Sequence, residues 1–399
     1  MTEWVSPFLK IMTRIPLILS LLGLFPALAL AQSGSRSAEI PGAGDSGVVT
    51  ILKEALHEQG VPAMAAAIVT SEGLTAIGTA GYRKRGTDIP VTLKDKWHLG
   101  SNTKAMTATL IAKLVELKKL RWETTTAEIY RRKRAQFHPV MRDVNFLHLL
   151  SHRAGLPHLF DLNPYGNGSG MSPRRNIVRA ALAKAPETAL GKHFEYSNLG
   201  FIVAGAMTEE ITGQSWEDSM KNWIFRPLKM KSSGFGGTGT PRKVDQPWPH
   251  LASGKPTATN GPEQDNLPSL GPAGRVHCTM EDWAKFVTDH LAGLRGKKAL
   301  LQKSSYQTLI TPPFPGSYAL GWGVHKRSWA GGNAINHNGS NTMNYSCAWM
   351  SPKRDFAVLV CTNQGGDLAA RACDDVAGNL IQLHLKRTAD QKDKSFSPQ

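Results

Sequence analysis

Strand-like sequence at both ends of the chain, and its absence from the middle, constrains the fold more than any other feature. Near the N-terminus, apolar runs at residues 63–70 and 74–82 flank the turn Ser71-Glu-Gly73, which predicts a β-hairpin. Near the C-terminus, Gly, Asn, Ser and Pro bound four more short runs, at residues 318–324, 334–337, 345–350 and 356–362. Between residues 121 and 265, apolar residues recur at helical spacing among Pro- and Gly-rich loops. This order predicts an α/β (α+β) fold in which both chain ends build one antiparallel sheet, flanked by helices.

The same pattern predicts the domain organisation. We expect a sheet domain formed by residues 47–105 and 271–386, with an inserted all-helical domain at residues 106–270. Thr279-Met-Glu-Asp282 has the spacing of a capping box and predicts the start of a helix that ends at Gly293. Other helices are expected at residues 48–59, 144–151, 175–185, 199–212, 216–226 and 368–385. The polar tail at residues 387–399 is expected to be disordered.

The first residues are typical of a secretory signal peptide. Lys10 and Arg14 precede an apolar run at residues 15–30, which ends in the cleavage-site pattern Ala29-Leu-Ala31. The run is shorter than the ~18–20 apolar residues of a membrane-spanning helix, although an uncleaved anchor is the alternative. We therefore expect a signal peptide at residues 1–31, a flexible Ser/Gly/Ala-rich leader at residues 32–46, and no stable membrane span after cleavage. The protein is expected to be exported, either periplasmic or secreted.

Charge and cysteine content limit the partners. The chain of 399 residues has a formal net charge of +16, which suits an anionic environment such as cell-wall or envelope polymers. Nucleic acid is not expected as a partner, because the positive charges are scattered and the one dense cluster, residues 130–134, has the character of a solvated face. The four cysteines permit zero to two disulfides in pairings that the sequence leaves open: Cys278, Cys347, Cys361 and Cys373.

Several cofactor and catalytic signatures are absent from the sequence. It contains no Gly-x-Ser-x-Gly elbow, no His-Glu-x-x-His and no P-loop lysine motif. Gly234–Gly239 has the spacing of a dinucleotide-binding loop, but no strand-like run precedes it and Pro241 follows it, so we interpret it as a turn. No Cys-x-x-Cys occurs. We expect neither a metal nor an organic cofactor.

Ser101 and Lys104 form the motif that remains, Ser-x-x-Lys, at the start of an apolar-periodic run. Positions i and i+3 of a helix lie on one face, about 5–6 Å apart at Cβ. A serine hydroxyl becomes nucleophilic when a base removes its proton, and a desolvated lysine, or an acid whose pKa a lysine lowers, can be that base. The N–H groups of a helix N-terminus favour developing negative charge. This combination suits acyl transfer; the alternative is a helix-capping serine with a lysine that reaches solvent.

Two further motifs turn this pattern into a resemblance. Tyr196-Ser-Asn198 precedes a helix-like segment, and His337-Asn-Gly339 ends a strand-like run. In the order Ser-x-x-Lys, Tyr-x-Asn, His-x-Gly, the chain resembles the penicillin-recognising serine hydrolases, which include class C β-lactamases, D-alanyl-D-alanine carboxypeptidases, D-aminopeptidases and esterases. Supporting matches lie at residues 149–157, 227–235, 271–276 and 318–322. The resemblance covers residues 48–385 and implies a β-lactamase/transpeptidase-like fold.

The resemblance implies roles for the three central residues. Ser101 would be the acylated nucleophile. Lys104 would hold positive charge against Ser101 and Tyr196. Tyr196 would accept the Ser101 proton and pass it to the leaving group. Whether Tyr196 or Lys104 is the general base stays open, because such coupled groups titrate as a unit.

The remaining motif residues would bind substrate. Asn198 would bond to the substrate or to Lys104, unless it is only a helix N-cap. The resemblance implies an oxyanion hole made by the N–H groups of Ser101 and Ser340, with Gly339 letting the strand approach the substrate. Other histidines, including His152 and His277, are interpreted as structural.

One departure from the family pattern bears on the substrate. His337 stands where β-lactamases and carboxypeptidases usually have the lysine of Lys-Thr-Gly, which helps to hold a substrate carboxylate. An imidazole is mostly neutral at pH 7 and is a weaker anchor for an anion. The resemblance therefore favours an esterase or D-amino-acid peptidase over an efficient β-lactamase.

We expect an exported serine hydrolase that cleaves an ester or amide through an acyl-enzyme, with a small molecule or a peptide, such as one derived from the cell wall, as substrate. Two alternatives stay open. The first is a peptidoglycan or β-lactam sensor that traps its acyl-enzyme, and the second is a basic polymer-binding protein without chemistry. The sequence does not give the oligomeric state.

Overall fold

The structure, a computed structural model, describes residues 40–165 and 171–396. The expected signal peptide, leader residues 32–39 and the last three residues of the tail lie outside the described residues. From Ile40 onward the chain forms one compact unit.

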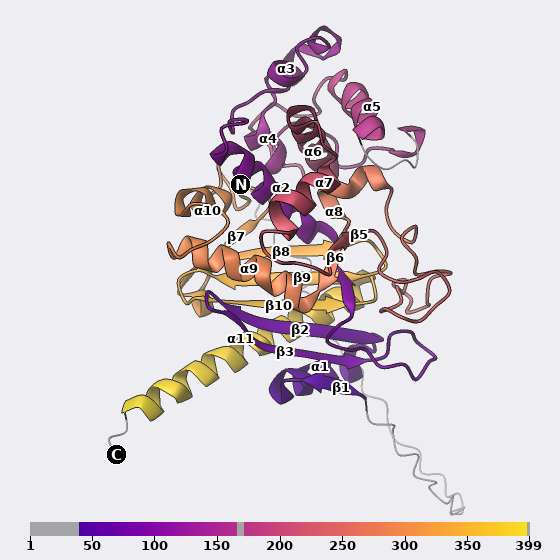
Figure 1. The fold of residues 1–399 in the computed structure, drawn as a ribbon, viewed down its shortest axis with the longest axis vertical. Helices are drawn as coiled ribbons and strands as arrows, with labels where there is room; N and C mark the ends of the chain where they lie inside the picture. Colours follow the sequence, from indigo (N-terminus) through magenta and orange to yellow (C-terminus); the bar gives the residue numbers. More distant parts are fainter. Residues whose placement is uncertain (1–39, 166–170, 397–399) are drawn as a thin grey trace, which may run out of the picture. The chain divides into compact units, whose positions relative to one another are not determined.

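A seven-stranded antiparallel sheet, in the order β1-β3-β2-β10-β9-β8-β7, is the centre of this unit (Figure 1). β2 from the N-terminal part pairs with β10 from the C-terminal part, with Ala65 opposite Cys361. The prediction of an antiparallel sheet built from both chain ends is therefore confirmed. The strands are β1 (Gly42–Gly44), β2 (Ala63–Thr70), β3 (Gly73–Gly81), β7 (Gly323–Arg327), β8 (Gly332–Ser340), β9 (Tyr345–Ser351) and β10 (Phe356–Thr362).

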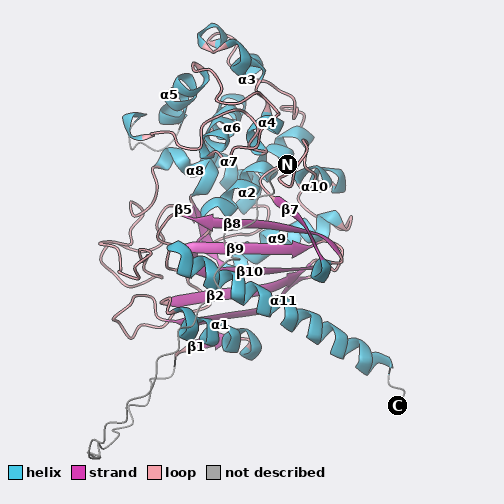
Figure 2. Cartoon of the chain, turned by 180° about the vertical axis from the view of Figure 1, so that it is seen from behind, coloured by secondary structure: helices cyan, strands magenta, loops and turns pink. Residues whose placement is uncertain are grey.

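Helices cover both faces of the sheet, which is why the central strands are apolar along their whole length. In β2, Ala65 and Ala67 pack with α9 (Met280–Leu294) on one face, while Met64 and Ile68 pack with α1 (Ser46–Gln59) and α11 (Gly366–Phe396) on the other. Figure 1 shows α9 in front of the strands, and Figure 2, from behind, shows α1 and α11. The alternation of β2 side chains thus divides the hydrophobic core into two layers.

The middle of the chain is mostly helical, and its helices share a hydrophobic core with residues of the C-terminal part such as Tyr306 and Leu320. The helix α6 ends at Gly213, as expected, and α9 begins with the Thr279 hydroxyl accepting a hydrogen bond from the Asp282 amide. The helices between the two parts of the sheet, besides α9, are α2 (Thr103–Glu116), α3 (Thr126–Ile129), α4 (Phe146–Leu150), α5 (Met171–Leu182), α6 (Asn198–Thr212), α7 (Trp216–Met220), α8 (Gly271–Gly274) and α10 (Lys303–Leu309).

The two ends of the unit are more ordered than the sequence predicts. The strand β1 lies within the segment that was predicted to be a flexible leader. It can pair with β3 because Gly44, at φ +113°, lets the two backbones come so close that a Cβ would lie 2.2 Å from the carbonyl oxygen of Ile77. At the other end, α11 continues to Phe396, beyond the predicted end at residue 385. Helix propagation costs little once the apolar first turns have docked, and Arg387 makes two hydrogen bonds to Asp45 at the start of α1.

A second, three-stranded sheet in the order β4-β6-β5 was not predicted. Its strands, β4 (Lys96–His98), β5 (Gly234–Phe235) and β6 (Val276–Thr279), are too short to show an alternating pattern. The predicted strand at residues 318–324 is also wrong, because a turn closed by the Ala319 amide and the Trp322 carbonyl interrupts it and β7 begins at Gly323. Both features lie beside the short 3₁₀ helix η1 (Gly100–Asn102) or α2.

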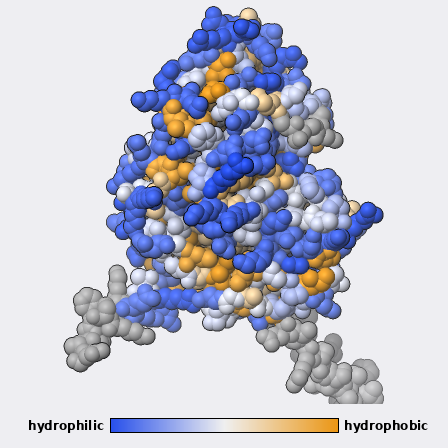
Figure 3. All heavy atoms as spheres, viewed as in Figure 1, coloured by the Kyte–Doolittle hydropathy of each residue, from blue (hydrophilic) through white to orange (hydrophobic). Residues whose placement is uncertain are grey.

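The four cysteines are free and buried, so the structure contains none of the disulfides that the sequence permits. Within the described ranges, no helix combines the length and the apolar character that crossing a membrane requires. Figure 3 shows a face covered largely by hydrophilic residues, with hydrophobic residues in separate patches, in keeping with the high net charge.

Candidate active site

Ser101 lies in η1, which leads directly into α2. Backbone packing fixes this segment against the sheet, because a Cβ on Gly100 would lie 2.5 Å from the amide nitrogen of Ser340. The Asn102 side chain donates to the Ser346 hydroxyl of β9 at 2.8 Å, and that hydroxyl donates to the Leu99 carbonyl at 2.8 Å. Ser101 is inside η1 rather than at a cap position, and its side chain is partly exposed. The helix-cap interpretation of Ser101 is therefore wrong.

Lys104 is fully buried rather than reaching solvent, so the second half of that interpretation is also wrong. Its Nζ contacts three oxygens, at 3.0 Å from Ser101 Oγ, 2.7 Å from Asn198 Oδ1 and 2.8 Å from the carbonyl of Ala273. All three are uncharged, and burial lowers the pKa of Lys104 well below that of a free lysine. Asn198 is the first residue of α6, where Ser197 is the N-cap, so of its proposed roles the structure shows the contact with Lys104.

Tyr196 contacts both Ser101 and Lys104. Lys104 Nζ is 4.9 Å from the centre of its ring. Burial raises the pKa of Tyr196 to about 12, and a hydrogen bond with Ser101 opposes this rise. The neighbouring Ser197 amide donates to Nδ1 of His152 at 3.0 Å, and the His152 ring packs 4.3 Å from the Tyr196 ring, centre to centre. The structure thus brings together Ser101, Lys104 and Tyr196.

His337 is 5 % exposed and is held in one neutral form. Its Nδ1 lies 2.7 Å from the Asn338 carbonyl, which accepts only, so Nδ1 carries the proton. Its Nε2 therefore accepts from the Tyr318 hydroxyl, 2.8 Å away. Burial, with the nearby charge of Lys104, lowers the pKa of His337 to about 3, and burial raises that of Tyr318 well above 10. This pair presents no positive charge at neutral pH.

Gly339 and Ser340 end β8 beside η1. A Cβ on Gly339 would lie 2.1 Å from the Leu99 carbonyl oxygen and 2.8 Å from the Ser101 amide nitrogen. Glycine is needed here because the backbone that leads into η1 approaches the strand too closely for a side chain. The sequence had predicted that only the substrate would approach Gly339. The backbones that carry the Ser101 and Ser340 amides are thus in direct contact.

Sequence reasoning missed two groups of the site and the contact that a third makes with Tyr196. The Ala273 carbonyl contacts Lys104, but a backbone oxygen leaves no sequence signal. Tyr318 was quoted only as part of a strand motif, yet it fixes His337. His152, interpreted as structural, does support Tyr196, and its motif at residues 149–157 was the available signal. His277 lies apart, bonded through Nδ1 to the Gly236 carbonyl.

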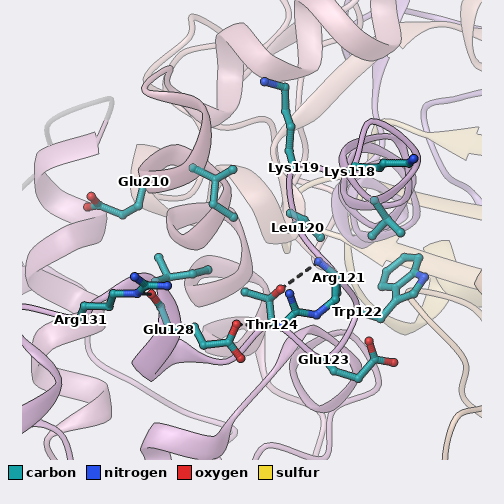
Figure 4. A pocket seen from close by; sticks show the side chains of 13 residues that line it. Lys118, Lys119, Leu120, Arg121, Trp122, Glu123, Thr124, Glu128, Arg131 and Glu210 are labelled. Carbon is teal, nitrogen blue, oxygen red and sulfur yellow. Dashed lines mark hydrogen bonds and ion pairs between the residues drawn. The ribbon is translucent and has the colours of Figure 1, made fainter.

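A separate hollow of about 730 Å³ lies between the end of α2 and α3 (Figure 4). Both basic and acidic side chains line it, and its lining contains no motif residue: Val115, Lys118–Thr124, Glu128, Ile129, Arg131, Glu210 and Ile211. In the part of the chain that the structure describes, no cluster of three or more His, Cys, Asp or Glu side chains could hold a metal ion.

Comparisons with known proteins identify the family. Residues 48–381 match the family model described as Beta-lactamase. "Penicillin-binding protein 4" of Amycolatopsis lactamdurans is 28 % identical over 77 % of this chain and 82 % of its own, and "Unguisins hydrolase ungD'" of Aspergillus campestris is 26 % identical over 88 % and 67 %. The octameric penicillin-binding protein homologue from Pyrococcus abyssi superposes with a TM-score of 0.69 at 21 % identity, covering 85 % of this chain and 77 % of that one. The chain belongs to the Beta-lactamase family of serine hydrolases.

Proposed function

We propose that the protein is an exported serine hydrolase that cleaves an ester or amide through an acyl-enzyme on Ser101. The observation that carries this proposal is the 3.0 Å contact between Lys104 Nζ, buried among uncharged oxygens, and the hydroxyl of a partly exposed serine. Burial destabilises the ammonium form of Lys104 and lowers its pKa, which favours the neutral amine that a general base requires.

Lys104 in its neutral form suits its three contacts. As an ammonium, Nζ donates to Ser101 Oγ, Asn198 Oδ1 and the Ala273 carbonyl. After loss of one proton, its two N–H bonds would still donate to Asn198 Oδ1 and the Ala273 carbonyl, and its lone pair would accept the Ser101 O–H. As Ser101 Oγ bonds to the substrate carbonyl carbon, its proton passes to Lys104 and the carbonyl electron pair moves to oxygen. The amides of Ser101 and Ser340 would hold that oxyanion.

Tyr196 supplies the proton for the second half of acylation. With its raised pKa it is a protonated phenol bonded to Ser101, so it donates to the leaving group as the carbonyl reforms. The phenol then recovers a proton from Lys104. A water molecule next attacks the acyl-enzyme by the reverse path, which releases the acid and restores the Ser101 hydroxyl.

The substrate is proposed to be uncharged near the end of β8. A substrate carboxylate there would lie beside the neutral His337–Tyr318 pair. A cation would be needed to offset the hydration that the carboxylate loses on binding. This favours an ester or neutral amide over a β-lactam, whose carboxylate needs an anchor. A hydrolase of small esters is therefore preferred to an efficient β-lactamase.

A fluorophosphonate probe tests the nucleophile. The wild-type protein should label and Ser101→Ala should not, while Ser340→Ala, which keeps its backbone N–H, is the control and should label fully. Full labelling of Ser101→Ala would remove Ser101 as the nucleophile.

A substrate panel then separates the activities. We expect turnover of p-nitrophenyl acetate to exceed that of nitrocefin and of a D-alanyl-D-alanine peptide. Preference for the peptide would assign the peptidase branch, and a long-lived adduct without turnover would support the sensor alternative.

Export is supported by the basic residues, apolar run and Ala-x-Ala pattern of residues 1–31. The mature protein should begin at Gln32. Mass spectrometry of the intact protein from the producing cells measures this, and a chain that retains residues 1–31 inside the cell would contradict export.

A further inference from the structure

Asp265 has a fully buried carboxylate, which contacts the strand β4 before Ser101 and the turn after Ser340. It accepts hydrogen bonds from three side chains, His98 Nε2 at 2.8 Å, Arg275 Nε at 3.1 Å and Asn341 Nδ2 at 2.9 Å. Burial opposes its ionisation, but the interactions with His98, Arg275 and Asn341 outweigh that effect and keep its pKa below the usual value. Asp265 is therefore an ionised carboxylate at neutral pH.

The first arm of this cluster reaches the residue before Ser101. The Gly100 amide donates to Nδ1 of His98 at 3.1 Å. Because that nitrogen accepts, the imidazole proton is on Nε2 and faces Asp265. Asp265 thus fixes the tautomer and orientation of His98, and His98 fixes the backbone of Gly100.

The second arm reaches the residue after Ser340. Asn341 donates through Nδ2 to Asp265 Oδ1, and its own Oδ1 accepts from the Asn344 amide at 2.9 Å. This closes the turn between β8 and β9. Arg275, the third partner, is two residues from Ala273, whose carbonyl contacts Lys104. The three partners of one carboxylate thus adjoin three parts of the site.

We propose that Asp265 is a positioning residue that sets the separation of the Ser101 and Ser340 amides through His98 and Asn341. The proposal rests on the proposed function, since it takes those two amides as the oxyanion hole. An oxyanion donor must lie within about 2.7–3.1 Å of the developing charge, so a small shift between η1 and β8 weakens catalysis.

A buried charge is suited to this task. Replacing a buried ion pair by apolar side chains often leaves stability unchanged, so the pair gives little net stability for its cost in desolvation. The carboxylate instead fixes the relative positions of its three partners. Its two oxygens accept from all three donors only when β4, the turn after β8 and the segment after α8 keep fixed positions.

Asp265→Asn is the test, because it preserves size. The amide NH₂ must face either Asn341 or the His98 and Arg275 donors, so one arm is lost in either orientation. We expect kcat for p-nitrophenyl acetate to fall about 10–100-fold, with KM changed less than about 3-fold and affinity for a boronate analogue of the tetrahedral state lowered in proportion to kcat.

Asp282→Asn is the matched control. Asp282 is also a buried carboxylate with three donors, the Ser232 amide and hydroxyl and Lys285 Nζ, but none of them adjoins the site. It should lose stability and keep kcat. An Asp265→Asn protein with unchanged kcat and boronate affinity would overturn the proposal and leave Asp265 as a structural ion pair.

Asn341→Ala provides a second variant if Asp265→Asn fails to fold. It removes one arm while the ion pair stays, so kcat and boronate affinity should fall together, and unchanged values would overturn the proposal. Ser101→Ala separates this outcome from failure of the proposed function. If Ser101→Ala is inactive and the Asp265 and Asn341 variants are fully active, the positioning role alone is wrong.

Discussion

Gly339→Ala tests the close contact between η1 and β8. The new Cβ would lie 2.1 Å from the Leu99 carbonyl oxygen and 2.8 Å from the Ser101 amide nitrogen. Ordinary contacts between such atoms are above 3 Å, so the strand and η1 must separate by about 1 Å. Both neighbours are backbone atoms, which cannot move aside as a flexible side chain would.

The effect should be larger on catalysis than on stability. Overpacking of this kind costs about 1–3 kcal/mol of unfolding free energy. Loss of one oxyanion donor lowers kcat about 10²–10³-fold, which corresponds to about 2.7–4 kcal/mol of transition-state stabilisation. We expect kcat for p-nitrophenyl acetate to fall by this factor in Gly339→Ala protein that is still folded at the assay temperature.

Steady-state kinetics and urea unfolding on the same preparation measure both effects. Gly378→Ala is the control, because a Cβ at that exposed position of α11 meets no atom within 4 Å. It should stabilise the helix by about 0.5–1 kcal/mol and leave kcat unchanged. A folded Gly339→Ala protein with wild-type kcat would refute the placement of the oxyanion hole between η1 and β8.

Three further changes test the electrostatics. His337→Lys should lower the KM for nitrocefin about 10-fold relative to the KM for p-nitrophenyl acetate, because hydrogen bonds to charged groups contribute about 1.5–3 kcal/mol. An unchanged ratio of the two KM values would contradict the argument that His337 and Tyr318 present no charge. As the pH is lowered, kcat/KM should fall when Lys104 becomes protonated, with a midpoint below pH 10.5. The His337→Gln protein should show the same fall, because the pKa of the His337 imidazole is about 3. Loss of this acid-side fall in His337→Gln would assign it to His337. Arg174→Met leaves Glu209 buried without its cation and should lower the free energy of unfolding, measured in urea, by about 3–5 kcal/mol. Arg175→Met, which breaks an exposed ion pair, should lower it by less than about 1 kcal/mol. Equal losses would contradict the argument that burial makes the first pair costly to break.

The sheet could be predicted because its strands carry their own signal. β10 lies between two helical layers, so all of its residues are buried and its sequence is a continuous apolar run between turn residues. β1 could not be predicted in this way. Its glycines suggest flexibility in the sequence, but in the structure they permit a close backbone approach to β3.

The candidate site was predictable only where side chains are themselves the signal. The order of the motifs was enough to anticipate that residues 101, 104 and 196 would meet, although they are far apart in sequence. The Ala273 carbonyl and the carboxylate of Asp265 could not be found, because a backbone oxygen has no residue type and Asp265 stands in a Pro-rich loop without periodicity. Their roles arise from what the fold places beside them.

The position of Lys104 explains why the motif begins a helix instead of lying on a solvated face. Its three oxygen partners come from η1, α6 and α8, which are separated by long stretches of sequence. None of these elements would lower the pKa of an amine by itself, because in water the ammonium form is favoured up to about pH 10.4. Only the assembled fold buries Nζ while offering neutral acceptors, so the lowered pKa of Lys104 is a property of tertiary structure. The same reasoning applies to His337, whose neutral form is fixed by a carbonyl and a phenol, and it makes the chemistry of this site depend on burial more than on the high net charge of the chain.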